Sequence, residues 1–161
     1  MPLRRQVLNG SRQRVSDHHL LGAVPGKQLR ATSPFREHQG VQSLVRDLNR
    51  LYREEPALWE ADFEGGGFEW IDANDADQNV LSFVRYSADR SRSLACIANL
   101  SGIDRPGYRI GVPKQGAWNV VLDTTMANGG YRSSEPTPWH GFDQSLTIDV
   151  PSLGVVWLVN G

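Results

Sequence analysis

Short apolar runs separated by turn residues fill the chain beyond Pro56, and they limit its fold more than any other feature. Within each run apolar and polar residues alternate, which is typical of a strand with one buried face. The pattern predicts strands over 68–71, 79–86, 93–100, 108–112, 117–122, 145–150 and 154–159. Because no helical pattern lies between these runs, we expect a mainly β fold, an antiparallel β-sandwich.

The alternation also predicts which side chains face the core. Three inward sets follow from it: Leu94, Cys96, Ala98 and Leu100; Tyr108, Ile110 and Val112; and Leu146, Ile148 and Val150. Trp118 and Trp157 lie within predicted strands, so we expect them in the core as well. A domain of about 100 residues buries enough apolar surface to fold alone.

The segment 38–55 has the period of an amphipathic helix instead. Its apolar residues recur at spacings of three and four and form one stripe: Val41, Leu44, Val45, Leu48, Leu51 and Tyr52. Pro56 then ends the helix. Such a stripe needs a partner, which leaves three alternatives: it packs on the β-domain, it dimerises, or it stays exposed.

The beginning of the chain is strongly basic. Residues 1–36 carry seven Lys or Arg against one Asp, a local charge of +6, and the remainder carries ten basic against seventeen acidic residues, or −7. Nucleic-acid binding and a presequence are two interpretations of such a charge. We favour a disordered arm, because the segment contains several Gly and Pro and no aromatic residue before Phe35. The expected organisation is an arm over 1–37, a helix over 38–55 and an all-β domain over 56–161.

Three segments carry a more specific signal. The first, 48–85, runs from the end of the predicted helix through three consecutive glycines into FEWID and an apolar strand. The second is 105–116, RPGYRIGVPKQG, followed by Trp118 and by Leu-Asp-Thr at 122–124. The third is 38–49, HQGVQSLVRDLN. Together they resemble the glycogen (1,4-α-glucan) branching enzymes of the α-amylase superfamily, over residues 38–159 well and over 16–21 weakly.

The resemblance implies the last helix of that family's catalytic barrel and the C-terminal all-β domain that follows it, in an enzyme of glycogen biosynthesis that forms α-1,6 branches. A (β/α)8 barrel needs ~250 residues and carries its chemistry at several strand ends. The chain has 161 residues. No residue matches the family's nucleophile, acid/base or third carboxylate, so we expect no catalytic residue here and no activity from this chain alone.

Two further hypotheses are a stand-alone glucan-binding module and an interaction subunit that docks through its helix onto a barrel or onto itself. Glucans are held by aromatic rings flanked by polar groups. In the long segment 124–144, which has no regular pattern, Trp139, His140 and Tyr131 are therefore candidate contacts to glycogen or amylose. Alternatively, Trp139 plugs one end of the sandwich. We interpret Trp70 as part of a domain interface, and expect Trp59 to cover the seam between helix and sheet.

The sequence predicts no cofactor and no metal site. Asp72, Asp75 and Asp77 lack the Gly and the terminal Glu of a standard calcium loop, so an Asx-turn cluster is favoured. The apolar runs are far shorter than the ~20 residues of a membrane span. The single Cys96 excludes an internal disulfide. We therefore expect a cytoplasmic setting and neither nucleic-acid nor membrane partners.

Overall fold

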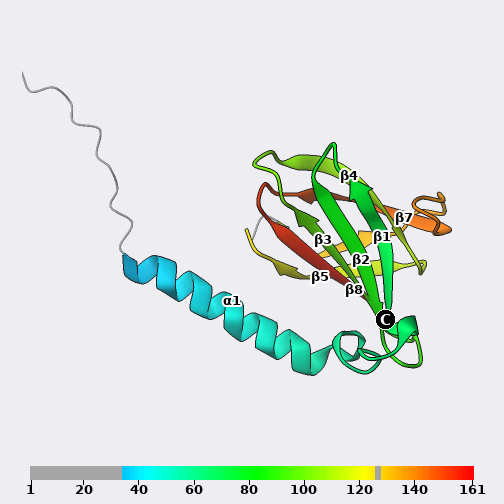
Figure 1. Ribbon diagram of the computed structural model, residues 1–161, viewed down its shortest axis with the longest axis horizontal. Coiled ribbons are helices and arrows are strands. Elements are labelled where there is room, and N and C mark those ends of the chain that lie inside the picture. Colours follow the sequence, from blue (N-terminus) through cyan, green and yellow to red (C-terminus); the bar gives the residue numbers. More distant parts are fainter. Residues whose placement is uncertain (1–33, 126–127) are drawn as a thin grey trace, which may run out of the picture. The chain divides into compact units, whose positions relative to one another are not determined.

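The computed structural model describes residues 34–125 and 128–161, with side chains from residue 39 onward. These described residues form one long helix, two single 3-10 turns and eight strands (Figure 1). The elements are α1 (Pro34–Glu54), η1 (Pro56–Leu58), η2 (Gly65–Gly67), β1 (Phe68–Asp75), β2 (Val80–Tyr86), β3 (Ser93–Asn99), β4 (Arg105–Val112), β5 (Ala117–Asp123), β6 (Tyr131–Ser133), β7 (Gln144–Val150) and β8 (Val155–Asn160). The predicted arm 1–37 lies outside the described residues, apart from its last four, which are helical.

The strands form two antiparallel sheets that pack as a sandwich. The larger sheet has the order β1-β2-β3-β8-β5-β6, and the smaller one pairs β4 with β7. The predicted fold class, a mainly β protein with an antiparallel sandwich preceded by one helix, is confirmed.

All seven predicted strands are present, with small differences at their ends. β1 continues to Asp75 and β4 already begins at Arg105. The sequence did not predict β6, which has only three residues and lies within the segment 124–144. It forms by antiparallel pairing with β5. Three residues are too few to show an alternation. The helix begins at Pro34 rather than 38, since proline in a first helical turn costs no hydrogen bond.

The main core lies between the two sheets. The inward sets predicted for β4 and β7 are all buried there, as is Trp118 at 0% exposure. The Trp118 Nε1 donates a hydrogen bond to the Lys114 carbonyl at 3.1 Å, so its polar edge is satisfied. At one end the buried Asn99 of β3 joins the sheets, because its amide donates to the Val150 and Pro151 carbonyls.

The core set predicted for β3 is confirmed in part: Leu94 and Cys96 are buried on one face, but this face is not the one toward the main core. Ala95 and Ile97 face the main core, whereas Leu94 and Cys96 belong to a second cluster on the outer face of the large sheet. Leu100 lies beyond the strand and is exposed. β3 is a central strand with both faces buried, so alternation cannot tell which face is inward. Trp157 packs against the same outer cluster and is only partly buried.

The linker 55–67 covers part of this outer face. Glu55 accepts two hydrogen bonds of 2.8 Å from Arg92, and Asp62 forms an ion pair of 2.6 Å with Arg85. Ala57 of η1 is fully buried in the outer cluster. Trp59 covers less of the seam than predicted, because 43% of it is exposed.

The apolar stripe of α1 is divided between a buried and an exposed part. Leu51 is buried, and Leu44 and Leu48 are partly buried. Val41, Val45 and Tyr52, on the flank of the stripe, are at least half exposed. Packing on the β-domain therefore accounts for only part of the stripe. No helix among the described residues is long and apolar enough to cross a membrane.

We expect the Cys96 thiol to be inert in the native protein. Burial raises its pKa from 9.0 to about 12, and the nearby Trp157 opposes this only in part. Because the thiolate is the reactive form, an aromatic disulfide reagent at about pH 8 should label the unfolded chain rapidly and the native chain very slowly. Rapid labelling of the folded protein would show that the outer cluster is open.

The same shift makes stability depend on alkaline pH. Above its ordinary pKa the unfolded thiol loses its proton while the native thiol keeps it, so the free energy of unfolding should fall as pH rises from about 9 toward 12. Urea titrations of the native sequence and of Cys96→Ala would separate this contribution. Equal slopes for the two proteins would contradict the assignment.

Candidate functional site

A small hairpin lies on the outer face of the two-stranded sheet. The chain between β6 and β7 first bridges Glu135 to Ser145 of β7. It then passes over β4. Here Trp139 and Phe142 bond to each other through two backbone hydrogen bonds of 3.0 Å and close the hairpin. The structure thus holds part of the long segment 124–144 against two strands.

Gly111 of β4 makes the close approach of this hairpin possible. Tyr108, Ile110 and Val112 point into the core, so Arg109 and Gly111 face outward. A Cβ atom at Gly111 would overlap the Trp139 carbonyl and lie 2.9 Å from the Phe142 ring. Only glycine fits beneath the hairpin, and it lies within the YRIGV motif.

The tip of the hairpin is a two-residue turn that sets the direction of His140. His140 and Gly141 both have positive φ, 50° and 83°, as a type I′ turn requires. The imidazole Nε2 lies 3.5 Å from the Asp72 carboxylate of β1. The side chain of Trp139, the residue before the turn, is 44% exposed. Trp139 therefore does not plug the sandwich, but lies on its surface.

Charged side chains border the Trp139 ring. The Arg109 guanidinium lies 5.9 Å from the centre of the ring, and its Nη2 is 3.2 Å from a Glu135 carboxylate oxygen. Thr147, opposite Arg109 in the sheet, is exposed on the same face. The indole thus has a cation over its ring, whose ion-pair partner is Glu135, and the His140 ring lies 5.5 Å away at a tilt of 48°.

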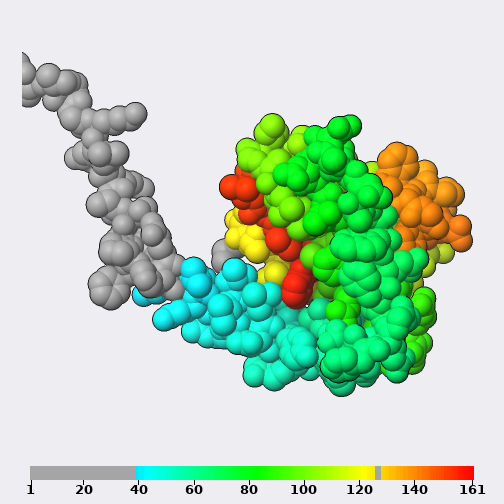
Figure 2. All heavy atoms as spheres, in the orientation of Figure 1, coloured from blue at the N-terminus to red at the C-terminus, as the bar shows by residue number. Residues whose placement is uncertain are grey.

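Tyr131, the third candidate glucan contact, lies away from Trp139 and His140. It belongs to β6, at one edge of the large sheet, and faces outward beside Asn119, because the neighbouring Trp118 points inward. His140 contacts β1, at the opposite edge of that sheet. Figure 2 shows the segment near residue 140, in orange, against the green β1 and β2 region. The structure therefore brings Trp139 and His140 together, but not Tyr131.

Sequence reasoning missed Arg109 and Glu135 as members of this site. The alternation of β4 placed Arg109 on the outer face, but nothing local indicated that Glu135, 26 residues away, would meet it. A pairing of this kind arises only when the loop folds back over the sheet.

The aspartates of 72–77 serve as turn acceptors. Asp72 accepts a hydrogen bond from the Asn74 backbone N–H at 2.8 Å, and Asp75 accepts one from Gln78. The Asx-turn interpretation is thus confirmed for Asp72, whereas Asp75 binds the backbone three residues on. Asp75 also accepts a hydrogen bond from the Tyr108 hydroxyl, whose pKa is raised by burial and by this carboxylate. Among the described residues no three His, Cys, Asp or Glu side chains are grouped to hold a metal.

A second aromatic group lies on the outer face of β1 and β2. Trp70 meets Phe68 edge-on at 5.0 Å between ring centres, and Phe83 stands beside both. Trp70 is half exposed. This group and the exposed flank of α1 are apolar surfaces that the described residues leave open.

Comparison with known proteins identifies the domain. The family model described as "Alpha amylase, C-terminal all-beta domain" matches residues 70–161. The chain belongs to this family. The match begins within β1 and includes every later strand, so it covers both sheets of the sandwich.

The similar curated proteins are 1,4-alpha-glucan branching enzymes, as the sequence motifs indicated. The chain is 45% identical over 132 residues to the enzyme of Thiobacillus denitrificans, 46% over 131 residues to that of Frankia casuarinae, and 44% over 129 residues to that of Rhodococcus jostii. These alignments cover 75–77% of the chain but only 16–18% of the relatives. The chain corresponds to a small part of such an enzyme, its C-terminal all-β domain.

The turn at His140 can be tested by substitution. A β-branched residue is strained at positive φ, so His140→Val should lower the free energy of unfolding by about 1 to 2 kcal/mol. Asn accepts this conformation, so His140→Asn should cost less than about 0.5 kcal/mol. Both variants lose the contact to Asp72, which leaves the turn as their main difference. Equal urea midpoints for the two would contradict the type I′ assignment.

Proposed function

We propose that this chain is the non-catalytic C-terminal β-domain of a 1,4-α-glucan branching enzyme, and that it forms no α-1,6 branches by itself. The observation that carries the proposal is the identity of 45% to such an enzyme along most of a chain that spans 18% of it. The family of the β-domain agrees with this assignment.

The size and the elements of the chain support the lack of activity. Retaining glycosyl transfer needs two carboxyl groups held about 5 Å apart across the scissile bond. In a (β/α)8 barrel such groups lie at the ends of different parallel strands. The described residues instead form antiparallel sheets and one helix. A cytoplasmic setting follows from the proposed role in glycogen synthesis.

A branching assay tests the proposal. Purified chain incubated with amylose should leave the iodine absorbance and the number of α-1,6 linkages at the level of the buffer blank. The intact branching enzyme of Thiobacillus denitrificans is the positive control. Branch formation by the 161-residue chain would refute the proposal.

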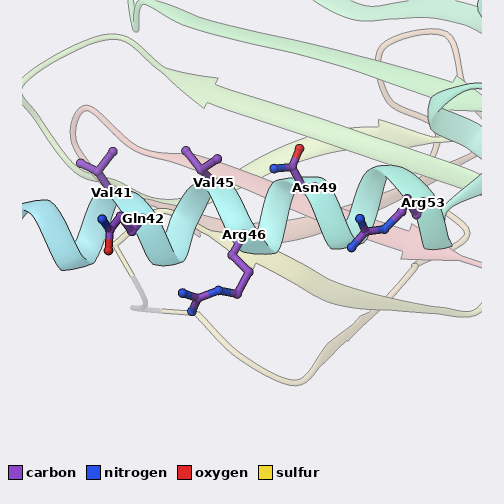
Figure 3. A pocket seen from close by; sticks show the side chains of 6 residues that line it. All are labelled: Val41, Gln42, Val45, Arg46, Asn49 and Arg53. Carbon is purple, nitrogen blue, oxygen red and sulfur yellow. The ribbon is translucent and has the colours of Figure 1, made fainter.

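The exposed flank of α1 is the proposed contact to the catalytic part of such an enzyme. Val41 and Val45 point to one side of the helix together with Asn49, while Arg46 points away from them (Figure 3). These residues, together with Gln42 and Arg53, line a shallow groove on the helix surface in which Val41 and Val45 are the apolar side chains. Val45 is 50% exposed, so a partner would bury apolar surface that the chain itself leaves in water.

One charge placed on this flank should disrupt docking. Val45→Glu is expected to weaken binding to the Thiobacillus denitrificans enzyme lacking its matching region by about tenfold or more, because it buries an unpaired carboxylate. Gln39→Glu adds the same charge at an exposed position of the same helix that does not line the groove, and should change binding by less than about twofold. Calorimetry gives both constants. A chain that does not bind this partner, but forms a dimer sensitive to Val45→Glu, would replace docking by self-association.

Glucan binding is a second candidate function, favoured by the exposed Trp139 with its charged neighbours. His140 supports this site by its position in the turn. Tyr131 is at least half exposed on the other edge of the large sheet, so it would form a separate contact with glycogen or amylose. Neither role needs a cofactor.

A further inference from the structure

We propose that the outer face of the two-stranded sheet holds a subsite for one glucosyl unit of a neutral α-glucan. Trp139 is the stacking surface, and Arg109 and Glu135 bind the hydroxyl groups. This inference rests on the second candidate function, glucan binding, and assigns it to particular side chains.

The backbone that carries the ring is held in place before any ligand arrives. The Trp139 backbone is held by two hydrogen bonds with Phe142 and by close packing of its carbonyl against Gly111. A rigid turn at His140 and Gly141 closes the hairpin. A preorganised aromatic surface loses little conformational entropy when it binds, which favours even a weak ligand.

The polar neighbours match a sugar ring. A pyranose has apolar C–H groups on its faces and hydroxyls around its edge, so it suits an indole face bordered by donors and acceptors. Arg109 offers N–H donors and Glu135 offers carboxylate oxygens, 3.2 Å apart. Their side chains are 34% and 55% exposed, so both remain accessible to hydroxyl groups.

The charges favour a neutral ligand. Arg109 and Glu135 compensate each other, and His140 lies next to Asp72. An anionic sugar would therefore gain from Arg109 and lose from Glu135 at similar distances. This balance points to an uncharged glucan rather than to a sugar phosphate.

The other exposed indoles lack this arrangement. Trp59 is exposed to nearly the same extent, 43% against 44%, but no cation lies over its ring among the described residues. Trp70 and Trp139 each have a neighbouring ring within 5.5 Å, but only Trp139, among the described indoles, has a cation over its ring. Trp59 is thus a matched control for stacking on an exposed indole alone.

The test uses the whole chain with glycogen in an affinity gel and with maltotriose in an NMR titration of the indole N–H signals. The wild-type chain should be retarded by glycogen, and maltotriose should shift the Trp139 signal. Because one ring supplies most of the contact, Trp139→Ala should weaken maltotriose binding by about tenfold, and Trp59→Ala by less than about twofold. Glu135→Gln and Arg109→Met should each weaken it by about threefold or more.

Trp139→Phe keeps an aromatic surface and should retain part of the affinity, which separates stacking from a fold defect. The dispersion of the backbone NMR signals shows whether each variant is folded. Retardation by glycogen that is unchanged in Trp139→Ala would overturn the subsite and leave glucan binding in place. Absence of binding to both glycogen and maltotriose by the wild-type chain would overturn both.

Discussion

The large sheet is apolar on both faces, and most other features of the protein follow from the need to cover them. One face packs on β4 and β7 and forms the main core around Trp118. The other face carries Leu94, Cys96 and Val159, which water would solvate poorly. The linker 55–67 covers only part of this face. Exposed aromatic residues at β1 and the exposed flank of α1 remain, and apolar surfaces of this kind are typical of contacts to a further domain.

Two ion pairs and a hydrogen bond hold the linker in place over this outer face. Arg85, Arg90 and Arg92, from β2 and the turn that follows it, bind Asp62, the Gly66 carbonyl and Glu55, respectively. Glu55 is nearly buried, so removal of Arg92 would leave an unpaired charge at the point where α1 ends. The helix is thereby fixed to the β-domain at its C-terminal end, while its exposed flank stays available to a partner.

Much of the fold could be predicted because the responsible interactions are local. Alternation in β4 and β7 identified their inward residues, since each of these strands has only one face in the main core. For β3 the rule identified two buried residues but not the face toward the main core, because both faces of this strand are buried. Of the candidate site, Trp139 and His140 were predicted from composition and resemblance. Arg109 and Glu135 were not, because the ion pair joins β4 to a loop 26 residues later.

The sequence by itself determined the strands, the amphipathic helix and the resemblance to branching enzymes, because hydrophobic period, turn residues and motifs are all read over short distances along the chain. Only the tertiary structure decided which face of β3 is inward and that the Trp139 hairpin rests on Gly111. It also decided that Tyr131 lies at one edge of the large sheet, while His140 lies close to the strand at the opposite edge. These outcomes depend on strand order and on the packing of segments far apart in sequence, which no local pattern encodes.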